Sequence, residues 1–172
     1  MVIPDSALDF GDVKINGTIG WELIRQLKWE FNFEKQKVYI SAPKKEDVCR
    51  NMAYDSFPLV RVSIDSKQQF MGLDTGANTT MFGKVMKDNF ENLEQSSVTS
   101  GAASGYKDNN SLVIPELNIG IGEGKVLLKN LNLLTDDEKS KSGFFITPGI
   151  LGMDIARHNI LTIDYFNRHI SV

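Results

Sequence analysis

The chain has few of the residues that build metal sites and disulfide frameworks. Its 172 residues include one cysteine, Cys49, and two histidines, His158 and His169. One cysteine excludes an intrachain disulfide, and this set leaves little material for a zinc site. No apolar run approaches the roughly 18 residues of a membrane-spanning helix. We therefore expect no metal, no other cofactor and no membrane span in this chain.

An excess of positive charge is also missing. Lys and Arg number 19 and Asp and Glu number 22, which gives a net charge of −3, and the basic residues form no cluster. The chain therefore lacks the electrostatic footprint of a nucleic-acid-binding protein. The first ten residues, which include Asp5 and Asp9, lack the basic and apolar regions of a secretory signal. The sequence indicates either a cytoplasmic chain or a mature piece whose signal lay upstream.

What the chain does contain is an internal repeat. Residues 2–40 align without a gap with residues 134–172, at an offset of 134 − 2 = 132. Apolar positions match along the alignment, as at Ile19/Leu151, Leu23/Ile155 and Val38/Ile170. Matched glycines and in-phase apolar residues indicate a repeated structural unit. The identical positions are Asp5/Asp137, Gly11/Gly143, Gly17/Gly149, Gly20/Gly152 and Arg25/Arg157.

Each copy of the repeat predicts a short helix followed by two strands. In the second copy we expect the helix at 153–158 and the strands at 160–165 and 169–172. In the first copy the same elements are expected at 21–27, 29–33 and 37–40. A polar segment with a proline follows the first copy and marks a boundary. The chain thus divides into the C-terminal remnant of one lobe (1–42), a linker (43–56) and a complete lobe of the same kind (57–172).

The remainder of the second lobe predicts mainly β structure. Val60, Val62 and Ile64 alternate with polar residues, as in a half-buried strand, and a return strand is expected at 69–73. Further strands are expected at 112–114, 117–121 and 125–128, with a hairpin turn at 122–124. A helix is predicted at 83–93. Residues 96–110 are rich in Ser, Gly, Ala and Asn, and they predict a mobile loop or a hairpin tip.

The residues best suited to chemistry follow the return strand. Asp74 stands at its end, and Gly76 permits a tight turn with close backbone approach. The hydroxyls of Thr75, Thr79 and Thr80 can hold the Asp74 carboxylate in a network. An Asx turn that merely ends a strand would use the same residue types. The tripeptide Asp74-Thr75-Gly76 alone therefore leaves both readings open, and its context has to decide.

The context resembles the retropepsin-like aspartic peptidases. Leu73-Asp74-Thr75-Gly76-Ala77 after a β-hairpin is similar to the active-site loop of that family, and Ile150-Leu151-Gly152 is similar to the motif that packs behind it. The segment between them matches the place of the family's flap. The resemblance covers residues 57–172, and it implies a mainly β fold, a closed barrel with one or two short helices. It also implies three groups of site residues: catalytic Asp74, Thr75 and Gly76; supporting Ala77, Ile150, Leu151 and Gly152; and flap residues Gly101, Ala102, Ala103, Ser104 and Gly105.

The function implied by this resemblance is hydrolysis of peptide bonds by water that paired aspartates activate. In aspartic proteases two carboxylates about 3 Å apart share one proton, so that one serves as base and the other as acid. This chain has a single Asp-Thr-Gly, at Asp74. The second aspartate would come from the missing part of the first lobe, encoded upstream, or from the mate in a homodimer. The substrate would be a peptide or protein, and bacterial relatives with two such lobes favour an exported location over the cytoplasm.

Two readings from other classes stand beside the peptidase. A barrel of this kind without its second aspartate would bind extended peptides and leave them uncut. The spacing of Asp74, Gly76 and Thr80 also resembles the phosphate loop of actin-like kinases, but those folds are much longer and need a second phosphate loop that we do not find. Asp154 is expected at a helix N-terminus, where the dipole favours it, rather than as the second catalytic acid.

Overall fold

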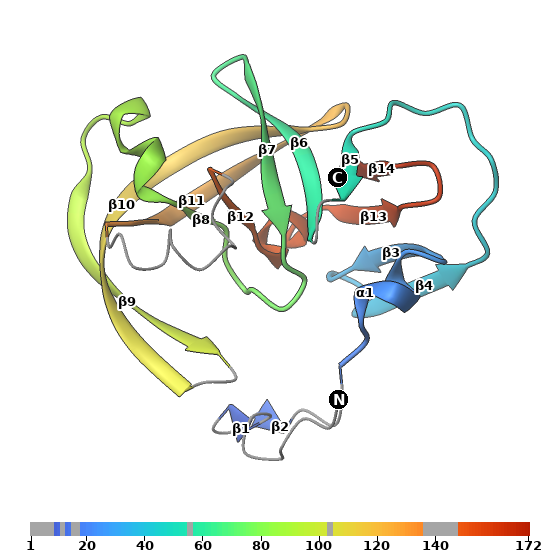
Figure 1. Ribbon diagram of the computed structural model, residues 1–172, viewed down its shortest axis with the longest axis horizontal. Coiled ribbons are helices and arrows are strands. Elements are labelled where there is room, and N and C mark those ends of the chain that lie inside the picture. Colours follow the sequence, from blue (N-terminus) through green and yellow to red (C-terminus); the bar gives the residue numbers. More distant parts are fainter. Residues whose placement is uncertain (1–8, 11–12, 15–17, 55–56, 103–104, 136–147) are drawn as a thin grey trace.

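The protein folds as a closed six-stranded β-barrel with a small sheet beside it (Figure 1). The computed structural model describes residues 9–10, 13–14, 18–54, 57–102, 105–135 and 148–172. The mainly β barrel with few short helices confirms the fold class that the sequence predicts. Around the ring the strands are β6 (Pro58–Ile64), β7 (Lys67–Leu73), β12 (Gly149–Leu151), β8 (Met81–Phe82), β11 (Gly124–Leu134) and β10 (Gly105–Ile121).

The long strand β10 closes the barrel because it changes neighbours along its length. Over residues 105–113 it pairs with β9 (Glu94–Ala102), and over residues 119–121 it pairs with β6. Its other edge pairs with β11 from Ser111 to Ile121, although Pro115 forms no ladder pair. Proline lacks the N–H that a ladder needs, and at this position neither β9 nor β6 is paired with the opposite edge.

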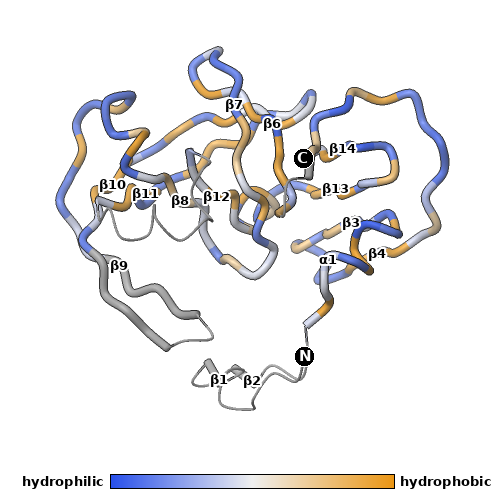
Figure 2. Tube along the Cα trace, in the orientation of Figure 1, coloured by the Kyte–Doolittle hydropathy of each residue, from blue (hydrophilic) through white to orange (hydrophobic). Residues whose placement is uncertain are grey.

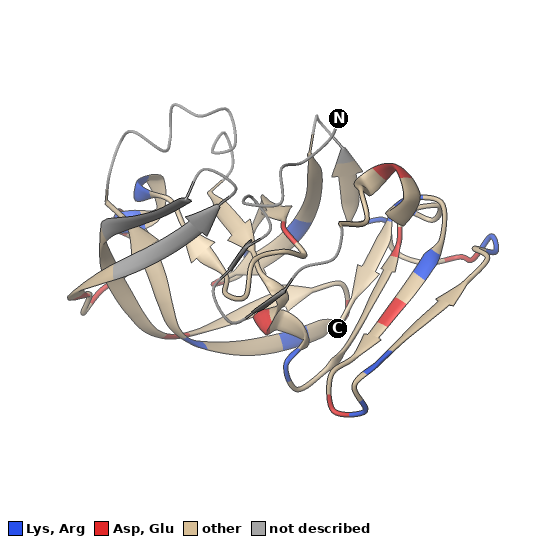
Figure 3. Cartoon of the chain, turned by 90° about the horizontal axis from the view of Figure 1, so that it is seen from below, with Lys and Arg blue, Asp and Glu red and all other residues tan. Residues whose placement is uncertain are grey.

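The interior of the barrel is filled by the inward-facing residues of these strands. Val60, Val62 and Ile64 are buried in alternation along β6, as their spacing predicts. Figure 2 shows hydrophobic residues along the strands and hydrophilic ones in the connections. Charges of both signs are scattered over the chain in Figure 3. In the part of the chain that the structure describes, no helix is long and apolar enough to cross a membrane.

The second sheet joins the two copies of the repeat. Its strand order is β14 (His169–Ser171), β13 (Ile160–Asp164), β3 (Lys28–Asn32) and β4 (Lys37–Ser41). Helix α1 (Trp21–Ile24) precedes β3, and the 3₁₀ helix η3 (Met153–Ala156) precedes β13. Adding 132 to the bounds of α1 and β3 gives those of η3 and β13. The repeat seen in the sequence is therefore a repeat of structure.

The turns of the two hairpins agree as well. Asn32 accepts the backbone N–H of Lys35 at 2.9 Å, and Asp164, its counterpart, accepts that of Asn167 at 3.2 Å. Gln36 and its counterpart Arg168 both have positive φ, 50° and 55°. The two copies of the repeat therefore agree even in the backbone conformation of single residues. The interpretation of residues 1–42 as the remnant of a lobe stays a prediction.

Four features differ from the sequence prediction in extent. The helix expected at 83–93 is a 3₁₀ helix, η2 (Lys84–Asn89), and Asn92 has a φ of 56° before β9 begins. Residues 96–102 and 105–110 form paired strands of a hairpin. The two strands expected on either side of Pro115 form one continuous strand, β10. Residues 52–54, within the predicted linker, form β5 (Met52–Tyr54), which pairs with β6. Away from these elements, β1 (Asp9–Phe10) pairs with β2 (Val13–Lys14).

Candidate active site

Asp74 lies where strand β7 ends and the chain turns. Its backbone N–H donates to the carbonyl oxygen of Leu151 at 3.0 Å, and its carbonyl oxygen accepts the N–H of Ala77 at 3.2 Å. Its side-chain Oδ1 accepts the backbone N–H of Gly76 at 2.8 Å. The side chain is partly exposed, whereas Thr75 and Gly76 beside it are exposed. The turn therefore fixes one carboxylate oxygen and presents the group at the surface.

Strand β12 supports this loop from behind. Ile150 and Leu151 pair in parallel with Gly72 and Leu73 of β7, directly before Asp74. On its other side β12 pairs with β8. The apolar-apolar-Gly motif thus runs beside the strand that ends just before Asp74. Its residues are placed next to the loop, and their roles stay a prediction.

The turn from β12 into η3 holds the far end of the loop. The backbone N–H of Met153 donates to the carbonyl oxygen of Ala77 at 2.8 Å. Gly152 packs so closely that a Cβ there would lie 2.5 to 2.8 Å from backbone atoms of Thr79. Real Cβ atoms do not approach backbone this closely, so only glycine fits. Backbone hydrogen bonds thus hold the loop at Asp74 and at Ala77, and this limits the positions that the Asp74 carboxylate can take.

Thr80 and Asp154 form the polar anchor of this support. Thr80 is fully buried, and its hydroxyl donates to Asp154 Oδ1 at 2.7 Å while accepting the N–H of Gly152 at 3.1 Å. Its backbone N–H donates to Asp154 Oδ2 at 2.8 Å. The expectation that Thr80 holds Asp74 is therefore wrong, because its hydroxyl is used by Asp154. Asp154 lies in the first turn of η3, as expected, and both its oxygens are engaged in this anchor.

Within the described residues, no second carboxylate is hydrogen-bonded to Asp74. A proton-sharing pair is therefore not formed from the described parts of this single chain. The predicted flap corresponds to the far end of the β9–β10 hairpin, where Gly105 pairs with Ala102 and Tyr106 pairs with Gly101. Ala103 and Ser104 lie outside the described residues. In Figure 1 this hairpin and the Asp74 loop both extend to the lower side of the barrel.

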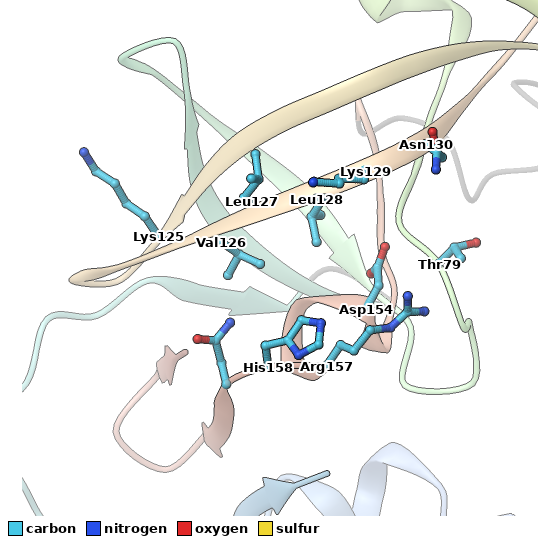
Figure 4. Close-up of a pocket in the computed structure, with 11 residues that line it drawn as sticks. Thr79, Lys125, Val126, Leu127, Leu128, Lys129, Asn130, Asp154, Arg157 and His158 are labelled. Carbon is cyan, nitrogen blue, oxygen red and sulfur yellow. The ribbon is translucent and has the colours of Figure 1, made fainter. Parts of the chain in front are cut away.

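A pocket of about 660 Å³ opens beside this support, between β11 and η3 (Figure 4). Asp154, Arg157 and His158 line one side of it, and Lys125 and Lys129 line the other. Asp74 is not among its lining residues. Asp154 is bonded to Thr80, and the side chains of Lys125, Lys129, Arg157 and His158 are exposed.

The structure also places the other residues that were considered in the sequence. His169 Nδ1 lies 2.8 Å from the carbonyl oxygen of Cys49, and Cys49 is an exposed free thiol. Arg25 forms an exposed ion pair with Glu22 at 2.6 Å. Among the described residues, no group of three or more His, Cys, Asp or Glu side chains is arranged to hold a metal ion. Comparison with protein-family models finds no match, and a search of curated proteins finds none either.

Proposed function

We propose that the protein is an aspartic peptidase in which Asp74 supplies one of two catalytic carboxylates. The observation that carries this proposal is the support of the Asp74 loop. The N–H of Gly76 fixes one carboxylate oxygen of Asp74. The loop is held in place by its contacts with β12 and Gly152 and by the hydrogen bonds between Thr80 and Asp154. A group that only ended a strand would need no such support. Preorganised placement of a reacting group is what catalysis requires.

The chemistry needs a second carboxylate facing Asp74. Hydrolysis without a metal requires a base to activate water and an acid to protonate the carbonyl oxygen. Two carboxylates at about 3 Å share one proton, because both cannot carry a charge at that distance. Asp74 in its ionised form would accept a proton from water while the protonated partner donates to the carbonyl oxygen. The second carboxylate would come from another lobe or another subunit.

The proposal is tested by peptide cleavage with the natural full-length protein and its Asp74→Asn variant. Asn keeps the size of the side chain and an oxygen for the Gly76 N–H, so the fold should be unchanged. We expect cleavage of a peptide library, followed by mass spectrometry, to be fastest on the acid side between about pH 3 and pH 7. The variant should lose about 10² to 10⁴-fold in rate. Asp88→Asn, an exposed aspartate on η2, is the matched control and should retain full activity.

One outcome would favour peptide binding over cleavage. If the wild type binds library peptides but leaves them intact at every pH, and Asp74→Asn binds them equally well, the peptidase proposal fails. The barrel would then be a peptide-binding module. Equal cleavage by wild type and Asp74→Asn would also contradict the proposal, because the activity would then come from another group.

A further inference from the structure

One edge of strand β11 has no strand partner over most of its length. On one side β11 pairs with β10 from Gly124 to Leu134, with a gap at Pro115. On its other side it pairs with β8, at Asn132 and Leu133. Among the described residues, no strand pairs with that second edge over residues 124–131. Alternate residues of an antiparallel strand direct their N–H and C=O groups away from the paired neighbour, so this edge presents backbone donors and acceptors.

The pocket of about 660 Å³ runs along this open edge. Residues 125–130 all line it, although their side chains alternate between the two faces of the strand: Val126 and Leu128 are buried, and Leu127 between them is 48% exposed. Residues of both faces line one cavity when the cavity follows the edge of the strand. In Figure 4, Val126 and Leu128 point from β11 toward η3, and His158, which follows η3, points back toward β11. The volume is in the range of ligand-binding sites.

The charge around this pocket is positive and unpaired. No hydrogen bond or ion pair joins the basic side chains of the lining to another described residue; they are Lys125, Lys129, Arg157 and His158. The acidic residue of the lining, Asp154, has both oxygens bonded. With His counted as neutral, three cations and one carboxylate give an excess of 3 − 1 = +2, in a chain whose net charge is −3. Such a concentration of one sign of charge around a cavity favours a ligand of the opposite sign.

We propose that this pocket is a docking site for an extended acidic peptide segment of a partner protein, which adds as a strand to the open edge of β11. The peptide backbone supplies the N–H and C=O partners that this edge lacks. Side chains of neighbouring strands lie opposite one another, so two acidic side chains face Lys125 and Lys129, and an apolar one between them faces Leu127. Asp74 does not line this pocket, and the inference goes beyond the proposed function without resting on it.

The spacing of the charges favours a peptide over a small anion. Lys125 and Lys129 lie four residues apart on one strand, and four residues of a strand span about 13 Å. One phosphate group cannot contact both amino groups of side chains set so far apart along the strand. An extended peptide has the same rise per residue as β11, so its own residues four apart match this separation. The open edge and the charges therefore point to the same ligand.

Amide NMR spectroscopy of the isotope-labelled protein tests the proposal. The probe is a capped peptide of sequence Glu-Val-Leu-Val-Glu, which reads the same in both directions and can therefore pair in either one. The protein carries Asp74→Asn in every measurement, so that the probe stays uncut. We expect amide shifts that saturate with probe concentration and are largest at residues 124–131 and 157–159. The probe Lys-Val-Leu-Val-Lys should bind at least about tenfold more weakly, because like charges then meet.

Matched changes in the protein and in the probe separate charge from backbone pairing. Lys129→Glu together with Arg157→Glu should weaken binding at least about tenfold. Lys67→Glu together with Lys87→Glu is the control: both lysines are exposed outside the pocket, the change in net charge is the same, and binding should be unchanged. Two further probes are N-methylated, one at both valines and one at the leucine and both glutamates. Only one of them should still bind, because an added strand uses the donors of a single edge.

Several results would overturn the proposal. One is the absence of shifts at residues 124–131 with the probe at about 1 mM. Others are equal binding of the Glu and Lys probes, equal binding by the two double variants, and equal behaviour of the two methylated probes. Shifts confined to the Asp74 loop would place the peptide in the candidate active site instead.

Two results would assign the edge to another occupant and also contradict the proposal. The same shifts could grow with protein concentration in the absence of the probe, which would make a second copy the occupant. Sodium phosphate could reproduce them, which would make it a small anion. Since binding is measured on the Asp74→Asn protein, it requires no catalysis. Failure of the peptidase proposal and failure of this docking site are therefore distinguishable.

Discussion

Gly152 and Gly20 stand at equivalent positions of the repeat but in different surroundings. Both have extended backbone, with φ of −93° and −73°, so any residue could adopt either conformation. A Cβ at Gly152 would overlap the backbone of Thr79, whereas a Cβ at Gly20 would have nothing within 4 Å. The need for glycine at position 152 is therefore entirely one of space.

This pair gives a prediction at the scale of a residue. Gly152→Ala should lower the free energy of unfolding by at least about 2 kcal/mol, because the backbone of Thr79 cannot move aside cheaply. Gly20→Ala in the 172-residue chain should be neutral, or stabilise by up to about 1 kcal/mol through the unfolded state. Urea unfolding of both variants measures the difference. Equal effects would contradict the close packing described for Gly152.

The residues of the candidate site were singled out in the sequence in two ways, by a local pattern and by the family resemblance. Asp74 and Gly76 stand out in a short local pattern, whereas the resemblance singles out Ile150, Leu151 and Gly152, and their roles stay a prediction. The bond between Thr80 and Asp154 could not be predicted, because it joins residues 74 apart in sequence. A threonine near an aspartate in sequence is a plausible partner for it. Only the path of β12 behind the loop brings Asp154 to Thr80 instead.

At the scale of an element, the turn after β13 fixes the connection between the two copies of the repeat. Asn167 Nδ2 donates to the carbonyl oxygen of Lys44 at 2.7 Å and to Asp164 Oδ2 at 2.8 Å. Its Oδ1 accepts the N–H of Glu46 at 3.1 Å. Two of these bonds hold residues 44–46 against the β13–β14 hairpin, and the third joins the buried Asn167 amide to Asp164 within the turn. The corresponding turn of the first copy has Lys35 at this position.

Asn167→Ala should therefore lower the free energy of unfolding by about 2 kcal/mol, since buried Asp164 also loses a partner. Lys35→Ala is the matched control in the equivalent turn. It should change stability by no more than about 0.5 kcal/mol, because only its backbone N–H is bonded there. Thermal unfolding, followed by circular dichroism, distinguishes the two variants. A neutral Asn167→Ala would mean that residues 44–46 are held by other contacts.

The elements themselves were predicted best where the pattern is short-range. The alternation along β6 and the two hairpins of the repeat appear as expected. The extent of β9 and β10 was not predicted, because Ser, Gly and Asn are poor strand formers and Pro115 interrupts the run. In the folded chain the pairing with β11 continues on both sides of Pro115. Long-range pairing overrides local preference there.

At the scale of the whole molecule, the four-stranded sheet is buried at one end, at Ile170 on β14, and exposed at the other, at Val38 on β4. Ile170→Ala should lower the free energy of unfolding by about 2 to 5 kcal/mol, because Ile170 is fully buried against the barrel. Val38→Ala, at the equivalent position, should change it by no more than about 0.5 kcal/mol in the 172-residue chain. Denaturant titration of the two variants provides the comparison. A cost for Val38→Ala as large as that for Ile170→Ala would mean that β4 is already covered.

The register of β3 and β13 also sets the order in which the chain can fold. Ile160 pairs with Asn32, so 160 − 32 = 128 residues separate the two partners. During synthesis at about 5–20 residues per second, β3 waits roughly 6 to 26 seconds before β13 has been made. An isolated hairpin such as β3–β4 is at best marginally stable in water. The sheet that joins the two ends of the chain is thus expected to form last, and until then its strands are free to pair with those of neighbouring nascent chains.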